Sequence, residues 1–259
     1  MTKQQQDIYR YYLKFRYRLF PYIYSAAIDA HLTGKPILAP LSFYHFSDKT
    51  SYDYEYEFMF GESFLAAPVL KKEVNQWEVY LPKGQWINYW TGQKFSGEQK
   101  VTISAKLYEN ESLPLFVKAG AIIPMYADRY TITDERPKLL KLDIYPEGNS
   151  NYTLLEKQSA NPKDTVEKTK IECLSNKKDV VVEFDSKYEE LELCLHLDKK
   201  PKEIFINDQK IAVLKSLNDF ETVKEGWYYG TGVFYGSKTM KTINVKHSGV
   251  GKCKVRIVR

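Results

Sequence analysis

Short apolar segments separated by turn residues recur from residue 58 to the C-terminus, and this spacing constrains the fold more than any other feature. The turns include Pro82-Lys83-Gly84 and Thr91-Gly92, whose residue types interrupt strands and reverse the chain. Strand-length segments with this regular spacing are typical of an all-β sandwich or barrel. For the first half of this region we predict strands at 58–60, 64–70, 77–81, 86–90, 101–104, 114–117 and 121–124.

The second half of the chain continues the same pattern after a mixed, polar stretch at residues 124–137, which we interpret as a junction between two β domains. Residues 242–247 and 252–258 alternate apolar and polar side chains, which predicts antiparallel sheets with one face in water. Residues 214–238 show the weakest pattern and are predicted to form a long loop. The predicted strands are 140–145, 152–155, 166–174, 179–184, 190–197, 202–206, 210–213, 240–246 and 252–258.

The N-terminal region has a different period. Apolar residues recur at steps of three and four over residues 7–33, which predicts a helix with one buried stripe. Pro21 lies inside this pattern and predicts a kink or a new helix start, and Gly34 is a suitable C-terminal stop. The apolar run at residues 36–46 is consistent with a buried parallel strand.

Composition excludes several classes of protein. No apolar run is long enough for a membrane-spanning helix. The net charge is +5, but the lysines are scattered, so we expect no nucleic-acid surface. The three cysteines, Cys173, Cys194 and Cys253, form no C-x-x-C pair, and we therefore predict neither a disulfide framework nor a metal site. No nucleotide or metalloprotease motif is present, so no cofactor is expected.

Several sequence strings resemble the C-terminal third of glycoside hydrolase family 31, which contains α-glucosidases and α-xylosidases. Residues 86–92 (WINYWTG) are similar to a Trp-x-Asp-x-Trp-x-Gly turn of that family, and the resemblance is strong over residues 8–125. The other strings are 16–25 (RYRLFPYIYS), 58–69 (FMFGESFLAAPV), 79–86 (VYLPKGQW) and 113–124 (LPLFVKAGAIIP).

The resemblance implies a fold: the end of a (β/α)8 barrel followed by two antiparallel β-sandwich domains. Under this interpretation residues 1–48 hold the last helix and strand of the barrel. Residues 49–126 then form the proximal sandwich, and residues 127–259 form the distal sandwich. The predicted fold class is accordingly mainly β.

The resemblance also implies an activity for a longer protein. It implies retaining hydrolysis of terminal α-linked sugars, most simply α-glucosides, by two carboxylates. In the family these are aspartates on earlier barrel strands, and no matching string occurs here, so we assign no catalytic residue and expect this chain alone to be inactive. The implied partners are an oligosaccharide substrate, bound through the missing barrel, and the barrel itself. The sequence indicates no cellular compartment.

Two departures from the family pattern are visible. Residues 39–41 read Ala-Pro-Leu where the family often has Arg-Pro-Leu, so a contact made by that arginine is in doubt. Residues 152–157 (YTLLEK) retain one acidic residue of a Tyr-Glu-Asp-Asp-Gly turn, which puts any role of that turn in doubt.

Acidic residues offer one candidate site. Asp53, Glu55 and Glu57 alternate with tyrosines after Asp48 and could line the rim of a barrel mouth. The alternative is a solvated loop with tyrosines packed beneath it, which we prefer.

The four histidines are weaker candidates. His31 suits the end of the predicted helix, where a cation complements the helix dipole. His45 follows the predicted barrel strand and could face an active site. His196 and His247 lie on predicted strands without a nucleophile motif.

Aromatic residues support a second class of function. Trp86 and Trp90 alternate onto one face with Asn88, beside Tyr89, and could form a sugar platform. Residues 227–229 (WYY) are a similar candidate. Packing inside the sandwich is the preferred alternative for both sets. A platform would make the chain a non-catalytic carbohydrate-binding module, with Trp90→Ala as the test. A third hypothesis is a purely structural fragment with an exposed apolar face on the helix.

Overall fold

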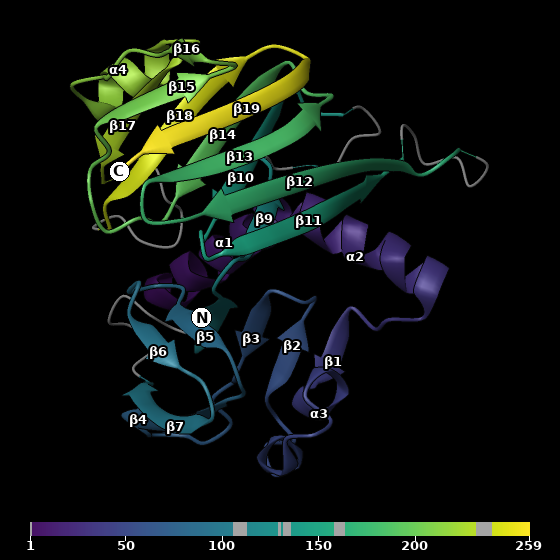
Figure 1. Ribbon diagram of the computed structural model, residues 1–259. Coiled ribbons are helices and arrows are strands. Elements are labelled where there is room, and N and C mark those ends of the chain that lie inside the picture. Colours follow the sequence, from purple (N-terminus) through teal and green to yellow (C-terminus); the bar gives the residue numbers. More distant parts are fainter. Residues whose placement is uncertain (1, 106–112, 129–130, 132–135, 158–163, 232–239) are drawn as a thin grey trace.

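The computed structural model describes residues 2–105, 113–128, 131, 136–157, 164–231 and 240–259 (Figure 1). The chain begins with two consecutive helices, α1 (Lys3–Arg18) and α2 (Phe20–Thr33). Pro21 lies in the first turn of α2, where its missing N–H costs no helical hydrogen bond, so the expected break is confirmed. Gly34 ends α2 in the left-handed conformation at φ 81°, as the sequence indicated.

The helices lead into a region of short strands that we call the proximal lobe (residues 38–118). Its main sheet has the order β1-β2-β3-β8-β5-β6, and β4 and β7 pair separately. Its elements are β1 (Leu38–Pro40), α3 (Leu41–Tyr44), η1 (Lys49–Tyr52), β2 (Phe58–Phe60), β3 (Phe64–Ala66), β4 (Gln76–Leu81), β5 (Gln85–Asn88), β6 (Lys94–Ser96), β7 (Gln99–Ser104) and β8 (Leu115–Lys118).

The predicted buried parallel strand at residues 36–46 is wrong in both extent and direction. Only Leu38–Pro40 is extended, and it pairs antiparallel with β2, with Ala39 opposite Met59. Leu38 and Pro40 are exposed while Ala39 is buried, so this is a half-buried edge strand. The chain then turns into α3, because Pro40 has no N–H to continue the ladder and Leu41 enters the core.

Two larger sheets form what we call the distal lobe (residues 122–258). Their orders are β17-β18-β14-β10-β9 and β11-β12-β13-β19-β15-β16. The elements are β9 (Ile122–Met125), β10 (Leu139–Ile144), β11 (Asn149–Glu156), β12 (Glu167–Ser175), β13 (Asp179–Ser186), β14 (Glu190–Leu195), β15 (Glu203–Ile206), β16 (Gln209–Lys210), α4 (Leu217–Thr222), β17 (Gly226–Gly230), β18 (Thr242–Ser248) and β19 (Gly251–Val258).

Strand pairing is antiparallel throughout these named strands except between β10 and β14, which run parallel with Asp143 opposite Cys194. The sequence did not indicate this exception, because a parallel pair buried on both faces and an antiparallel pair have similar apolar patterns. β9 pairs antiparallel with β10 at the edge of the five-stranded distal sheet. Residues 122–125 thus join the distal sheet, although the expected proximal sandwich runs to residue 126. The three-domain division as a whole stays a prediction.

The predicted long loop at residues 214–238 contains two regular elements in its described part. Ser216 and Asp219 form a capping box that starts the short helix α4. The strand β17 follows and pairs with β18 from Gly226 to Gly230. Tertiary pairing stabilises β17, which the local pattern alone did not reveal. Residues 232–239 lie outside the described residues.

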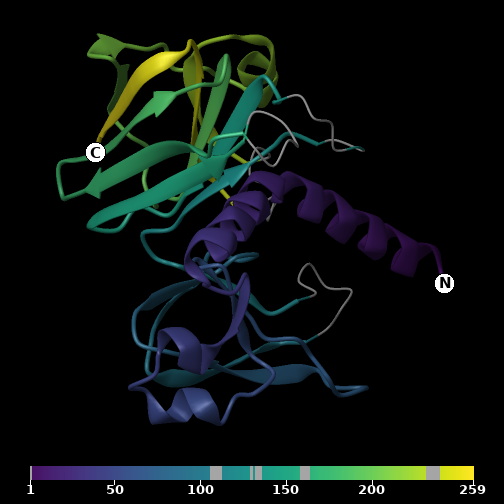
Figure 2. The same ribbon diagram turned by 90° about the vertical axis from the view of Figure 1, so that its right-hand side faces the viewer.

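Three apolar clusters hold the lobes together. The distal core lies between the two distal sheets, and a proximal core surrounds Trp86 and Phe116. A third cluster joins Phe15 and Tyr22 of the helices to the proximal sheet and to Tyr145 of the distal lobe. Figures 1 and 2 show α1 and α2 running between the two lobes, with the N-terminus projecting away from them. The mainly β fold class is confirmed, and no described helix is long and apolar enough to cross a membrane.

Candidate functional site

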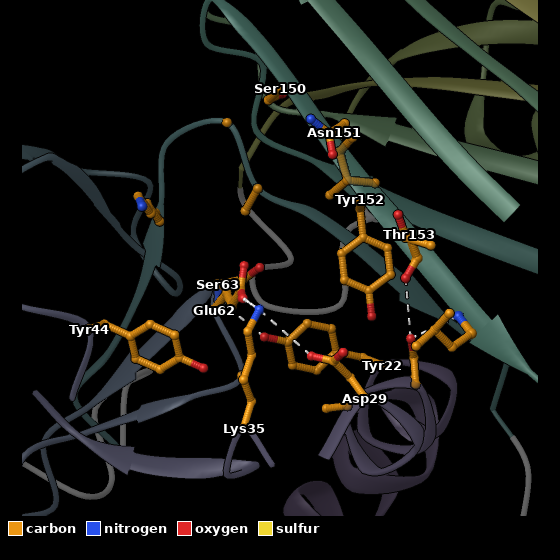
Figure 3. A pocket seen from close by; sticks show the side chains of 18 of the residues that line it. Tyr22, Asp29, Lys35, Tyr44, Glu62, Ser63, Ser150, Asn151, Tyr152 and Thr153 are labelled. Carbon is orange, nitrogen blue, oxygen red and sulfur yellow. Dashed lines mark hydrogen bonds and ion pairs between the residues drawn. The ribbon is translucent and has the colours of Figure 1, made fainter. Parts of the chain in front are cut away.

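A cavity of about 840 Å³ opens between α2, the proximal lobe and the distal strand β11 (Figure 3). Its walls come mainly from four segments of the chain: one face of α2, residues 61–63, residues 118–122 and residues 149–155 of β11. The cavity is therefore a product of how the lobes are assembled around α2, and no local sequence motif marks it.

Lys35 lies at the mouth of this cavity between two carboxylates. Its Nζ is 2.8 Å from Oε1 of Glu62 and 3.9 Å from Oδ2 of Asp29. The hydrogen bond to Glu62 is the main reason that the pKa of Lys35 is raised. Figure 3 shows the ammonium directed at both acids, beside the ring of Tyr44.

Deeper in the cavity, Tyr22 and Ser25 fix α2 to both lobes. The Tyr22 hydroxyl donates to the carbonyl of Phe60 at 2.8 Å and accepts from the Ser63 N–H at 3.2 Å. The approach requires Gly61, since a Cβ there would lie 2.1 Å from that hydroxyl oxygen. Ser25 accepts from the N–H of Leu155 at 2.9 Å. Burial raises the pKa of Tyr22 well above its usual value.

The side chains that line the cavity do not form the carboxyl pair that glycoside hydrolysis requires. A retaining glycosidase uses two carboxyl groups about 5 Å apart, one as nucleophile and one as proton donor. Asp29 and Glu62 are instead ion-paired with the same ammonium group. The described cavity can hold a polar ligand against the phenol rings, but it does not present an acid and a nucleophile.

The acidic candidates have structural roles. Asp48 caps η1 by accepting from the Thr50 N–H at 3.1 Å and accepts from the Tyr80 hydroxyl at 2.7 Å. Asp53 and Glu55 are exposed, as the solvated-loop interpretation expects. That interpretation is wrong for Glu57, which is buried and accepts from the Tyr80 N–H at 3.0 Å. It is also wrong for Tyr52 and Tyr56, which are exposed and do not pack beneath the loop. Burial raises the pKa of Glu57 to about 8.

The histidines are dispersed over the molecule. His31 lies in the last turn of α2, as expected. Burial and the nearby Lys118 lower the pKa of His45, which follows α3. His247 Nδ1 is 2.8 Å from Glu225, and His196 Nε2 is 2.6 Å from Oδ1 of Asp143 in a buried pair that sequence reasoning missed.

The proposed sugar platform is buried. Trp86 belongs to the proximal core and Trp90 to the cluster around the helices, so the two rings do not share a face. The alternation ends at Asn88, whose Oδ1 accepts from the N–H groups of Trp90 and Thr91 and turns the chain. Trp227 is also buried in the distal core. The packing interpretation is confirmed for these tryptophans.

Comparison with known proteins places this architecture in a family. Residues 34–123 match the profile described as the glycosyl hydrolase family 31 C-terminal domain. An α-xylosidase of Saccharolobus solfataricus is 32% identical over 155 residues, which are 60% of this chain and 21% of that protein. The chain belongs to glycosyl hydrolase family 31. Its recognition from sequence strings is thereby confirmed.

Two further similarities extend over most of the chain. An isomaltosyltransferase of Sporosarcina globispora, 30% identical over 227 residues, aligns with 85% of this chain and 20% of its own length. The structure of a family 31 dextranase from Flavobacterium johnsoniae, complexed with glucose, superposes with a TM-score of 0.84 at 24% identity. It covers all of this chain and 33% of the dextranase chain, so the distal lobe also shares its fold. The chain spans about a fifth of the length of these curated relatives.

The two departures from the family 31 pattern can now be placed. Ala39 is buried opposite Met59, so this position holds a small apolar side chain inside the proximal lobe. Glu156, the retained acid, is buried and accepts a hydrogen bond from the hydroxyl of Tyr188. Burial raises its pKa. Both positions now serve packing within the lobes.

Proposed function

We propose that this chain is the C-terminal part of a retaining α-glycosidase of family 31. In that enzyme it would support a catalytic barrel that residues outside this chain form. The match of residues 34–123 to the C-terminal domain of the family carries this proposal. By their names, the relatives above are an α-xylosidase, an isomaltosyltransferase and a dextranase. We infer a terminal α-linked sugar, most simply an α-glucoside, as the substrate of the whole enzyme. The catalytic aspartates would lie outside these 259 residues.

Exposed large apolar side chains in the first 70 residues favour a barrel-supporting role. Phe46 is 74% exposed, and further large apolar side chains are exposed on α1, near the end of α2 and between residues 38 and 70. Contact with a further domain would cover such side chains. The exposed residues in this region are Tyr9, Leu13, Leu32, Leu38, Phe43, Phe46, Tyr52, Tyr56 and Leu70.

The alternative of a non-catalytic carbohydrate-binding module loses its main support. Its test residue, Trp90, is 5% exposed and its Nε1 donates to the Leu113 carbonyl at 2.6 Å. The ring also packs near Tyr11 and Phe15 of α1. A sugar cannot stack on a ring whose faces are already covered.

The deciding experiment reads the DNA upstream of the Met1 codon and assays the 259-residue chain. We expect the reading frame, or an adjacent gene, to encode a barrel with two aspartates, and the chain alone to release no product from para-nitrophenyl α-glucoside or α-xyloside. Hydrolysis by the chain alone would contradict the proposal, as would an isolated gene with no barrel partner.

A dye measurement tests the interface separately. The chain should bind a hydrophobic dye, and Phe46→Ser should reduce that fluorescence more than Val250→Ser, a comparably exposed position (68%) in the distal lobe. Equal effects of the two substitutions would remove the argument for a proximal interface.

A further inference from the structure

Three side chains with metal-binding atoms meet on one face of the five-stranded distal sheet. Asp143 of β10 and Cys194 of β14 are opposite each other in the parallel pair. His196 follows two residues later, and its N–H continues the ladder by donating to the carbonyl of Ile144 at 3.0 Å. One carboxylate oxygen, the thiol sulfur and one imidazole nitrogen all lie within 4.8 Å of one another.

The period of the strands explains why these groups share a face. Leu142 and Ile144 point into the distal core, as do Leu193 and Leu195. The alternate residues Asp143, Cys194 and His196 therefore point the other way, toward the cluster that joins the two lobes. Cys194 packs against that cluster, and Tyr145 is part of it. The trio thus lies at the junction of the lobes.

The site is shielded from water. The side chains of Asp143 and His196 are 5% and 8% exposed. A buried carboxylate is costly unless it is paired, hydrogen-bonded or bound to a metal ion.

A second layer of groups orients the trio. The Tyr145 hydroxyl donates to Oδ2 of Asp143 at 3.2 Å, which leaves Oδ1 for the imidazole or for an ion. The Tyr145 ring stacks on His196 at 4.0 Å with an interplanar angle of 5°. The hydroxyl of the buried Thr242 donates to Oδ1 of Asn244 at 3.1 Å. Outer contacts of this kind fix the orientation of ligands in metal sites.

We propose that Asp143, Cys194 and His196 bind one divalent transition-metal ion, with zinc as the best fit. A thiolate, an imidazole and a carboxylate together are typical of Zn²⁺, whereas Mg²⁺ and Ca²⁺ prefer all-oxygen sites. The thiol releases its proton to solvent on binding, and the neutral imidazole coordinates through Nε2. Tetrahedral coordination would open the Asp143–His196 contact from 2.6 Å to about 3.3 Å, and a water would complete the ligand set.

Such an ion would act as a structural link. It would join β10 to β14 beside the cluster shared by both lobes, and it would neutralise the buried carboxylate. The sequence did contain a partial signal, because a C-x-H pair within a strand places both side chains on one face. The third ligand is 51 residues earlier in the chain, so only the strand register identifies it.

The experiment uses the untagged 259-residue chain, stripped with a chelator and titrated with Co²⁺ and then Zn²⁺. We expect a thiolate-to-cobalt charge-transfer band that saturates at one equivalent and disappears when zinc is added. We also expect zinc to raise the midpoint of thermal unfolding. The absence of this band in the folded wild-type chain would overturn the proposal.

Variants assign the band to this site. Cys194→Ala should abolish it, while Cys253→Ala, which removes another buried thiol, should retain it. Tyr145→Phe keeps the ligands but loses an outer hydrogen bond and should weaken zinc binding by about 10- to 100-fold. A band that survives Cys194→Ala, or one lost in Cys253→Ala while that variant stays folded, would also overturn the proposal.

Discussion

The two lobes differ in how completely they bury their own apolar surface. The distal lobe encloses its core between two large sheets, and among its described residues the large apolar side chains that are exposed are Leu174, Val213 and Val250. The proximal lobe has shorter strands and shares one cluster with α1, α2 and Tyr145. It also carries Phe43 and Phe46 exposed to solvent.

This difference indicates that the distal lobe is the more stable of the two and that the proximal lobe is better suited to contact a further domain. A sandwich closed on both faces buries enough apolar surface to persist by itself. A lobe that relies on neighbouring helices and leaves apolar side chains exposed is suited to hold a further domain. We therefore expect the proximal lobe to depend on the distal lobe, and the distal lobe to be independent.

The largest effects should come from the two core tryptophans. Trp86→Ala and Trp227→Ala each remove a buried ring and should cost about 3–5 kcal/mol of unfolding free energy. Loss of Trp86 should open the proximal lobe alone, whereas loss of Trp227 should open both lobes. Hydrogen exchange measured by mass spectrometry distinguishes these patterns. Equal opening of both lobes in both variants would contradict the independence of the distal lobe.

A pH-dependent effect should come from Glu57 in the proximal lobe. Glu57 has a folded pKa of about 8, above the value of 4.5 expected when unfolded, so the folded state binds its proton more tightly. Its contribution to stability is complete below about pH 4.5 and is lost as pH rises to about 8. The shift in pKa limits the loss of unfolding free energy between these pH values to about 5 kcal/mol. We expect a loss of about half that size, because local opening would rehydrate the carboxyl group.

Glu57→Gln should remove that dependence while keeping the hydrogen bond from the Tyr80 N–H. Denaturant unfolding of both proteins at several pH values is the measurement. The exposed Glu55 provides the matched control, and Glu55→Gln should leave the pH profile unchanged. An identical pH profile for Glu57→Gln and the wild type would show that this carboxyl group is hydrated in the folded state.

A smaller effect should follow from loosening α2 at the distal lobe. Ser25 bridges α2 and β11 by accepting from the Leu155 N–H and donating to the Thr153 carbonyl at 3.4 Å. Ser25→Ala leaves a buried N–H unpaired and should cost about 1–3 kcal/mol. Urea unfolding measures the cost, and the exposed Thr33→Ala on the same helix serves as the control.

The smallest effect should come from the ion pair that crosses between the lobes. Lys94 and Asp198 lie 2.8 Å apart, with side chains 58% and 77% exposed. Solvent screens such a pair, so Lys94→Ala should change the unfolding free energy by less than about 1 kcal/mol. A larger loss, measured at low and high salt, would mean that surface charge rather than the shared apolar cluster couples the lobes.

The sequence alone determined the local structure well. The period of residues 7–33 predicted a helix, and Pro21 predicted a kink or a new helix start, of which the structure has the new start. Short apolar segments between turn residues predicted most strands of both lobes. Family-specific strings identified the family, since several independent motifs occur in the correct order. These properties are encoded within short windows of the chain, where residue type acts directly on backbone geometry.

Tertiary structure decided what depends on distant residues. It placed β1 antiparallel to β2, paired β10 with β14 in parallel, and buried Glu57, although the two residues before it are exposed. It also brought Asp143 to Cys194 and His196. Pairing partners and burial are set by which surfaces exclude water together. That competition involves the whole chain, so no single window of the sequence contains its outcome.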